Sequence, residues 1–313
     1  MKLHPSLNTS GGGRYIVEHE TFYSYVVPVS QSWQLGRLTP RVLPWQRVVS
    51  HSLTIDPLPN ERHEATDSFG NVVSHFALHG AHHQLRVRMH CQVEVTERVH
   101  LDTDHAMTVA EVREAVRRQS PGANDLDAAR MAEATPLVPW SEAARDYAES
   151  SLQADRPWVE ALLDLTHRIH EDFEFDADAT TVSTSVDEVL QHRRGVCQDF
   201  AHLMLACLRA HGLPARYLSG YLLTDPPPGM PRLMGVDASH AWVGAFLPGH
   251  GWVEFDPTNG IVGNTDLIRV AIARDPRQAV PLHGSWLGEA GDFIGMDVEV
   301  DCRAQAELES QLP

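Results

Sequence analysis

The sequence contains no apolar run that approaches the roughly 20 residues needed to span a bilayer. Its first residues lack the charged start, apolar core and small-residue cleavage site of a secretory signal. Basic residues are also scarce: 25 Lys and Arg stand against 42 Asp and Glu, for a net charge of −17. A nucleic-acid partner would require a basic face, so none is expected. We therefore expect a cytoplasmic protein with neither a membrane nor a nucleic acid as its partner.

Cysteine is scarce as well. The four thiols, which form no CxxC pair and show no repeated spacing, are Cys91, Cys197, Cys207 and Cys302. This pattern favours free thiols in a reducing compartment over a disulfide framework. Histidine is abundant, with 19 residues, and one group gathers at His79, His82, His83 and His90. Because the spacing of this group matches no familiar ligand pattern, we interpret its members as exposed loop histidines rather than a metal site.

The pattern of residues divides the chain into four segments. Residues 1–13 read as a flexible leader, 14–100 as a β-rich N-terminal domain, 101–138 as a connecting segment, and 139–313 as a second domain that carries the candidate catalytic residues. In the β-rich domain, apolar side chains occupy alternate positions over 85–95, which predicts a strand with one face buried. Several antiparallel strands without helices predict a sandwich-like domain there.

The second domain mixes helical and extended patterns. Helices are predicted near 141–148, 157–173, 185–190 and 197–210, and strands near 215–223, 239–247, 252–256 and 297–301. Two β-rich regions around a helical one make this domain α+β.

The stretch from Gly195 onward reads as a turn that becomes a helix. After Cys197, apolar residues recur at intervals of three and four, and the helix is expected to end at His211 and Gly212. Cys197 therefore begins a helix, where backbone N–H groups lack acceptors within the helix. The positive end of the helix dipole favours a thiolate over a thiol. A thiolate nucleophile needs a base, and the base needs a group that orients it.

Two candidates for these roles lie on a predicted hairpin. His240 opens one strand and Asp256 closes its partner, with a tight turn at 248–251 between them. A hairpin turned there makes the two residues nearly opposite or diagonal neighbours, and side chains in such pairs are within reach. A carboxylate that holds an imidazole beside a cysteine is the arrangement of an activated nucleophile.

A cysteine, a histidine or an aspartate taken singly also has a simpler, structural interpretation. Cys207 and Cys91 fall on apolar faces and are expected to be packing residues. A single histidine among many is usually structural, and Asp256 before Pro257 is also a common start of a turn. Chain order, element type and hairpin register together favour the catalytic interpretation of Cys197, His240 and Asp256.

Four blocks of sequence resemble the bacterial transglutaminase-like proteins, in order along the chain: RGVCQDFAH at 194–202, PARYLSGY at 214–221, SHAWV at 239–243 and GWVEFDPTNG at 251–260. Residues 14–98 resemble the β-rich region that precedes this core in bacteria. The resemblance implies a papain-like transglutaminase core, in which the cysteine begins a helix packed on an antiparallel sheet. It also implies no metal or organic cofactor and a Cys–His–Asp triad at Cys197, His240 and Asp256.

The expected chemistry is attack on a carboxamide, loss of an amine and resolution of a thioester. The backbone N–H of Cys197 is the natural oxyanion donor, and Gln198 and Trp242 are candidates for the remaining oxyanion or cleft positions. Water as the acceptor makes an amidase or cysteine protease, which we favour, and a lysine amine makes a protein-glutamine γ-glutamyltransferase. A non-catalytic binding or scaffold protein on the same fold is the third alternative. The expected partner is a peptide or protein substrate, with an amine acceptor in the transferase case, and the oligomeric state is open.

Overall fold

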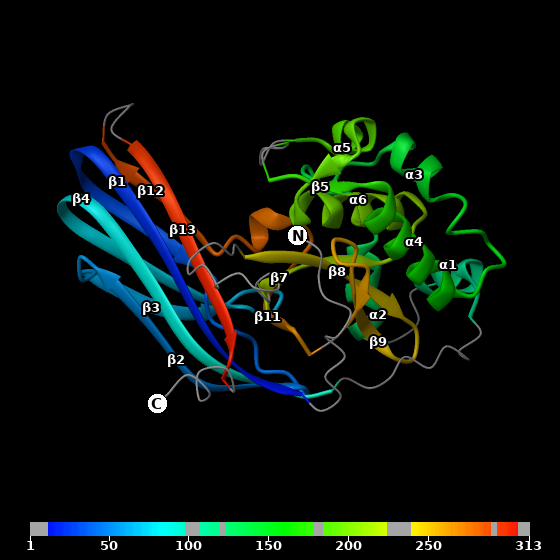
Figure 1. Ribbon diagram of the computed structural model, residues 1–313, viewed down its shortest axis with the longest axis horizontal. Coiled ribbons are helices and arrows are strands. Elements are labelled where there is room, and N and C mark those ends of the chain that lie inside the picture. The colour runs from blue at the N-terminus through cyan, green and yellow to red at the C-terminus, as the bar shows by residue number, and fades with distance from the viewer. Residues whose placement is uncertain are drawn as a thin grey trace, which may run out of the picture.

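The computed structural model describes residues 12–97, 107–118, 123–177, 179, 184–223, 239–263, 265–288 and 293–305. Figure 1 shows a large β-sheet on one side of the molecule and a group of helices on the other, with a second sheet between them. The predicted flexible leader lies outside the described residues up to position 11, and Gly13 already begins the first strand. In the described part of the chain, no helix is long and apolar enough to cross a membrane.

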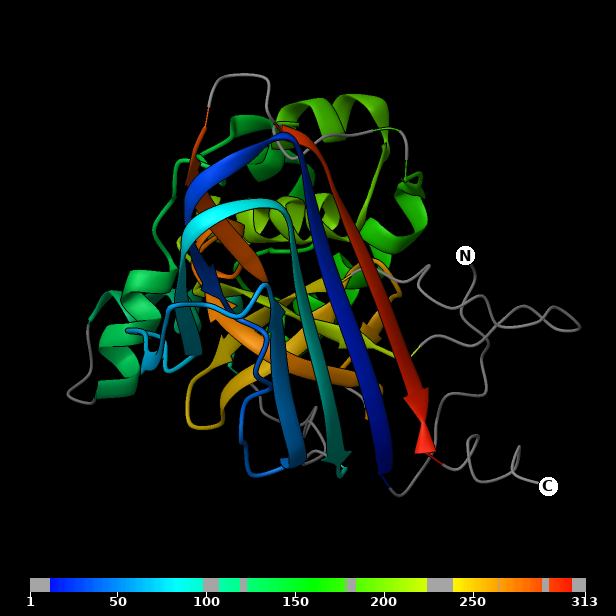
Figure 2. The same cartoon turned by 90° about the vertical axis from the view of Figure 1, so that its left-hand side faces the viewer.

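Two long strands, β1 (Gly13–Gly36) and β4 (Val72–Val95), form the centre of the first sheet. They pair antiparallel over most of their length, and β2 (Gln46–Asp56) and β3 (Glu61–Thr66) lie along the other edge of β4. The pairing of β1 with β4 is interrupted after Ser24, where both strands bend over, as Figure 2 shows. Side chains from both sides of the bend share one apolar core, in agreement with the predicted sandwich-like arrangement.

The histidine group differs from the prediction. It lies on β4 rather than in a loop, and His82 is buried. Its ring is hydrogen-bonded through Nε2 to the Ser32 hydroxyl at 3.2 Å and through Nδ1 to the Gly80 carbonyl at 2.8 Å. These partners satisfy an imidazole inside the bend of the sheet, which the turn-like residues around it did not reveal.

The last two strands of the chain complete the first sheet. Both β12 (Leu282–Leu287) and β13 (Phe293–Ala304) pair antiparallel with β1, and β13 adds Val300 and Cys302 to its core. The range 139–313, expected to form one domain, is therefore divided between two sheets. The sequence did not indicate this division, because pairing between strands so far apart leaves no local pattern at either strand.

Helices occupy the middle of the chain, largely where the sequence predicts them. Their bounds are α1 (Val109–Arg117), α2 (Ala123–Met131), α3 (Glu142–Ala148), α4 (Trp158–Asp172), α5 (Val186–His192) and the short 3₁₀ helix η1 (Pro276–Gln278). Ser141 caps α3, and Ser185 with Glu188 forms the predicted capping box of α5. Both α1 and α2 lie in the expected connecting segment, where α2 begins among Asn and Asp residues that favour turns.

The second sheet is antiparallel. Its strands are β7 (Ala215–Leu222), β8 (His240–Leu247), β9 (Gly251–Asp256), β10 (Ile261–Val262) and β11 (Leu267–Ala273). They lie in the order β10–β9–β8–β7–β11, and β8 with β9 forms the predicted hairpin, in which Gly244 faces Glu254. Separately, β5 (Glu174–Phe175) and β6 (Arg194–Gly195) pair in parallel just before the cysteine helix.

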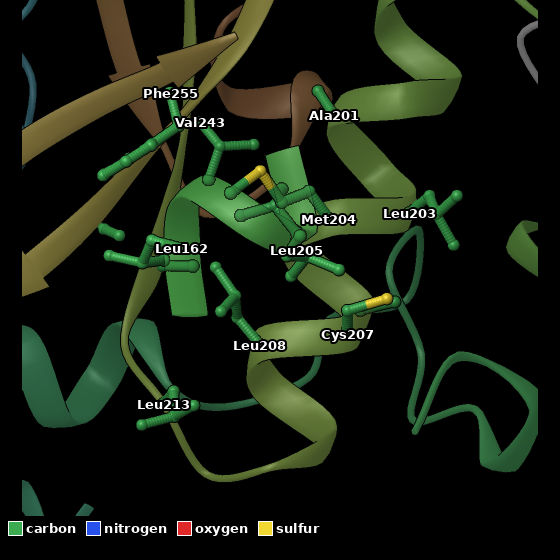
Figure 3. Packing of buried hydrophobic residues seen from close by; sticks show 14 of the residues in the cluster. Leu162, Ala201, Leu203, Met204, Leu205, Cys207, Leu208, Leu213, Val243 and Phe255 are labelled. Carbon is green, nitrogen blue, oxygen red and sulfur yellow. The ribbon is translucent and has the colours of Figure 1, made fainter. Parts of the chain in front are cut away.

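The cysteine helix, α6 (Cys197–Ala210), lies at the centre of the second core, and all of its residues from 199 to 209 are buried. Figure 3 shows its side chains packed together with Leu162 of α4 and Val243 of β8. Cys207 is fully buried in this packing, as predicted. The packing fixes the axis of α6 and with it the position of its first residue.

The two sheets meet along β11. Tyr221 of the neighbouring strand β7 packs into the core of the first sheet. The side-chain amide of Gln46 accepts the N–H of Arg269 and donates to its C=O, each at 2.8 Å. The amide of Asn71 accepts the N–H of Ile272 at 2.8 Å and donates to its C=O at 2.7 Å. The two amides take the hydrogen-bonding positions of a neighbouring strand, so β11 is not left as an open edge.

Gln46→Ala removes one of these bridges and leaves the N–H of Arg269 without its acceptor, whereas the C=O of Arg269 keeps the backbone N–H of Arg41 at 3.0 Å. A buried polar group left unsatisfied costs about 1–3 kcal/mol, so we expect the free energy of unfolding, measured by urea titration, to fall by about 1–3 kcal/mol. Gln84→Ala, at an exposed position of β4, is the matched control and is expected to change it by less than about 0.5 kcal/mol. A Gln46→Ala protein as stable as wild type would contradict the bridging role.

Candidate active site

Cys197 is the first residue of α6 and follows β6 by one residue. The turn before it depends on Gly195, because a Cβ there would lie 2.8 Å from the Asp199 carboxylate. Asp199 uses this space to accept the N–H of Val196 at 2.8 Å. The N–H groups of Cys197 and Gln198 come before the first hydrogen bonds inside the helix, so the helix offers them no acceptor of its own.

The four cysteines differ in exposure. Cys197 is partly exposed, whereas Cys91, Cys207 and Cys302 are buried. Burial raises the pKa of Cys91 to about 12 and that of Cys207 further still. The thiols of Cys91 and Cys207 are therefore held in the protonated, unreactive form at neutral pH, as expected for packing residues.

His240 begins β8 and Asp256 ends β9, and His240 Nε2 lies 2.8 Å from Asp256 Oδ2. The carboxylate is fully buried and accepts N–H groups from the residues just after it. The backbone N–H groups of Thr258 and Asn259 donate to Oδ1 at 2.9 and 3.3 Å, and the Asn259 amide donates to Oδ2 at 2.6 Å. A carboxylate with so many donors is held as an anion in one orientation.

The histidine also reaches the cysteine. Nε2 is engaged by Asp256, and Cys197 is close enough to the imidazole to contribute to its pKa, so Nδ1 is the ring nitrogen left for Cys197. Burial by itself lowers the pKa of His240, but the Asp256 carboxylate and the bonds to Asp256 and Cys197 outweigh burial and raise it. For Asp256, burial raises the pKa, and His240 with the neighbouring donors lowers it on balance. The site therefore favours an imidazolium that is paired with the Asp256 carboxylate and lies beside Cys197.

Trp242, a candidate for an oxyanion or cleft position, has its indole N–H engaged inside the protein. Its indole is fully buried, and its N–H donates to Glu254 Oε2 at 2.8 Å. The N–H is thus already used, and the ring instead lies parallel to that of His240, with centroids 5.8 Å apart and an interplanar angle of 18°. Gln198 is half-buried in the first turn of α6, next to Cys197, and its part in an oxyanion hole stays a prediction.

Two residues of the site were not singled out from the sequence. The Asn259 amide lies beside the ion pair, 2.6 Å from Asp256 Oδ2 and 3.5 Å from His240 Nε2. An Asp followed by Pro, Thr and Asn is typical of a turn closed by the carboxylate, and that pattern was the available signal. Glu254 lies two residues before Asp256 on β9, so the period of two places both on one face of the strand.

The described residues were also compared with the requirements of a metal site. Among the residues that the structure describes, no group of three or more His, Cys, Asp or Glu side chains could hold a metal ion.

Two protein-family models match the chain. The model described as the bacterial transglutaminase-like N-terminal region matches residues 15–94, and the model described as the transglutaminase-like superfamily matches residues 145–257. The first range covers most of β1 to β4. The second contains Cys197, His240 and Asp256, in agreement with the resemblance noted in the sequence.

Similar proteins are found in several bacteria. An uncharacterized protein of Mycobacterium tuberculosis is 39% identical over 311 residues, which cover 95% of this chain and 94% of that protein. An uncharacterized protein of Mycobacterium leprae is 30% identical over 297 residues, covering 92% and 98%. A protein-glutamine gamma-glutamyltransferase of Pseudomonas aeruginosa matches more locally, at 37% identity over 92 residues, which are 28% of this chain and 14% of that protein.

Among solved structures, one from Cytophaga hutchinsonii, provisionally named a cysteine protease, covers 94% of this chain and 91% of its own. The TM-score is 0.74 and the sequence identity is 20%, so this likeness concerns the fold. Together with the family models it confirms the predicted fold class: an α+β, papain-like transglutaminase core preceded by a β-sandwich-like region.

Because His240 and Asp256 form an ion pair, the stability of the fold is expected to fall both at high pH and at low pH. Because the pKa of His240 is raised in the folded state, its contribution to stability is full below the ordinary histidine pKa of about 6.5. That contribution is lost as the pH rises through the pKa of His240 in the folded protein. Because the pKa of Asp256 is lowered in the folded state, its contribution to stability is full above the ordinary aspartate pKa of about 4. That contribution is lost as the pH falls through the pKa of Asp256 in the folded protein. Asp256→Asn removes both contributions, so we expect its loss of Tm to be largest between about pH 4 and 6.5.

The comparison is made by thermal denaturation in a Cys197→Ala background, which removes the neighbouring thiol. Asp155→Asn, at an exposed position before α4, is the control and is expected to leave the Tm nearly unchanged over the same range. A loss of Tm in Asp256→Asn that is the same at every pH would show that the carboxylate does not form this ion pair.

Proposed function

The chain belongs to the transglutaminase-like superfamily, and we propose that it is a cysteine-dependent acyl-transfer enzyme that acts on peptide or glutamine-type carboxamides. The observation that carries this proposal is the approach of Cys197, His240 and Asp256 from three separate elements. The start of a helix supplies a nucleophile, the start of a strand supplies a base, and the end of the next strand supplies the group that orients the base.

The first half of the reaction begins at the sulfur of Cys197. In the reactive form His240 is the imidazolium that has already taken the thiol proton on Nδ1, and the thiolate attacks the amide carbon, so a C–S bond forms and the carbonyl electron pair moves to oxygen. When the tetrahedral intermediate collapses, the imidazolium gives its proton to the nitrogen and the C–N bond breaks. An amine or ammonia leaves, and a thioester stays on Cys197. Asp256 stabilises the imidazolium through Nε2 during both proton transfers.

The second half returns the enzyme to its starting state. A water molecule gives a proton to His240, and its oxygen attacks the thioester carbon. The C–S bond breaks, the sulfur recovers the proton from the imidazolium, and a carboxylic acid is released. With a lysine amine in place of water, the same steps give a new amide.

The negative oxygen of each tetrahedral intermediate needs hydrogen-bond donors already in position. The backbone N–H of Cys197 is the first candidate, because it lies at the start of α6 and the helix has no acceptor for it. Gln198, the next residue, is the second candidate. Trp242 is not proposed as a donor, since its N–H is held by Glu254.

We favour water as the acceptor, which makes the protein an amidase or cysteine protease with a peptide or protein substrate. Transfer to an amine, as in a protein-glutamine γ-glutamyltransferase, is the second candidate, and the local similarity to the Pseudomonas aeruginosa enzyme of that name supports it. A binding or scaffold protein on this fold is the least favoured, because such a protein has no need of a thiol, an imidazole and a carboxylate in contact.

Incubation with glutamine-containing peptides, with and without a primary amine, separates these reactions by mass. Deamidation of the side chain identifies an amidase, gain of the amine identifies a transferase, and a cut in the backbone identifies a protease. We expect Cys197→Ala to abolish all of these products, because no other described cysteine is exposed. Its Tm should stay close to that of wild type, since the thiol is only partly buried.

Cys207→Ala is the matched control, because this cysteine lies on the same helix and is fully buried. It removes a packing atom, so the Tm should fall, but the products should persist below that temperature. Product formation by Cys197→Ala at the wild-type rate would contradict the proposed function.

A further inference from the structure

A buried chain of contacts leads from His240 through Trp242 and Glu254 to Arg269. The ring of Trp242 lies parallel to the imidazole, and its indole N–H donates to Glu254. The carboxylate of Glu254 forms an ion pair with the guanidinium of Arg269 on β11. These three side chains are almost completely enclosed, with exposed fractions of 0% for Trp242, 2% for Glu254 and 5% for Arg269.

The burial of this ion pair is not explained by stability alone. Taking two charges out of water costs several kcal/mol for each ion, and apolar residues of the same size often stabilise a core equally well or better. What Glu254 supplies, and an apolar residue would not, is a fixed anionic acceptor for an indole N–H. Hydrogen bonds to a charged acceptor are about twice as strong as those between neutral groups.

We propose that Glu254 is a positioning residue that, held by Arg269, fixes the indole of Trp242 against the ring of His240. This inference rests on the proposed function, in which His240 is the base. The stacked indole limits rotation of the imidazole and covers one face of its hydrogen bond to Asp256, where excluding water strengthens the bond. An aromatic face also favours the imidazolium that forms when the thiol gives up its proton.

Arg269 is in turn held by the N-terminal region. Its guanidinium lies over the ring of Trp45, 4.7 Å from the centroid, and the amide of Gln46 bridges its backbone. The first sheet therefore reaches the base through Arg269, Glu254 and Trp242. On this view the N-terminal region is part of the active site's supporting structure.

Alkylation of Cys197 by iodoacetamide tests the inference without a known substrate, because the thiolate is the reactive form. The rate is measured on the full chain at pH 6, with peptide mapping to assign the label to Cys197. Trp242→Phe keeps an aromatic ring beside His240 but removes the N–H that Glu254 holds. Because small displacements of a base are costly, we expect alkylation to slow roughly tenfold.

Trp158→Phe is the matched control. It also removes a buried indole hydrogen bond, but one to a neutral acceptor, from Trp158 to the carbonyl of Phe246 at 2.9 Å, within the core around α6. It should lower the Tm about as much as Trp242→Phe does, yet leave the alkylation rate at the wild-type value. The difference between the two variants is the effect that a merely structural tryptophan does not produce.

A second variant tests Glu254 directly. Glu254→Leu combined with Arg269→Met replaces the ion pair by apolar side chains of similar size, a change that cores usually tolerate. It leaves Trp242 without its acceptor, so we expect alkylation to slow as much as in Trp242→Phe. Adding Trp242→Phe to this variant should cause no further loss, because both changes act through the same hydrogen bond.

Equal rates in wild type and Trp242→Phe would overturn the positioning role, as would equal slowing in Trp242→Phe and Trp158→Phe. His240→Ala separates this failure from failure of the proposed function. If His240→Ala is alkylated as fast as wild type, both are overturned, because His240 is then not the base. If His240→Ala is slow and Trp242→Phe is not, the role of Glu254 alone is overturned.

Discussion

The burial of α6 on every side is the constraint on which the site depends. A helix with apolar side chains around its circumference has to be enclosed, and here β7 and β8 cover one face while α3, α4 and α5 cover the others. Each large apolar side chain contributes about 1.5–3 kcal/mol when buried, so a small shift of the helix would expose several at once. Its first turn is the part that reaches the surface, and Cys197 lies there. The core, rather than a loop, holds the nucleophile in place.

The sequence predicts best those elements whose stabilising interactions are local. The apolar spacing of α6, its end at Gly212 and the turn between β8 and β9 each involve residues close together in the chain, and all three were predicted. The pairing of β13 with β1 joins opposite ends of the chain. Neither strand carries a signal that names its partner, so the predicted extent of the second domain differs from the pairing in the structure.

The residues of the candidate site show the same contrast between local and long-range interactions. Cys197, His240 and Asp256 lie at the ends of predicted elements, so their approach could be predicted from helix and hairpin geometry. The sequence did not reveal the partner of Trp242: a buried indole N–H requires an acceptor, and that acceptor is Glu254. An acidic residue on a strand usually faces water, and the burial of Glu254 depends on Arg269 from a strand that the sequence did not predict.

The pairing of β13 with β1 also affects the order in which the molecule can assemble. Because β1 is synthesised before β13, the edge of β1 that pairs with β13 stays unpaired while the second core is synthesised. During that interval the positions that Val300 and Cys302 later fill are open. An unpaired edge with alternating apolar side chains is also where a growing chain pairs with its neighbours on a polysome. The nascent protein is therefore most exposed to aggregation before β13 emerges, and the first sheet is completed only once that strand is available.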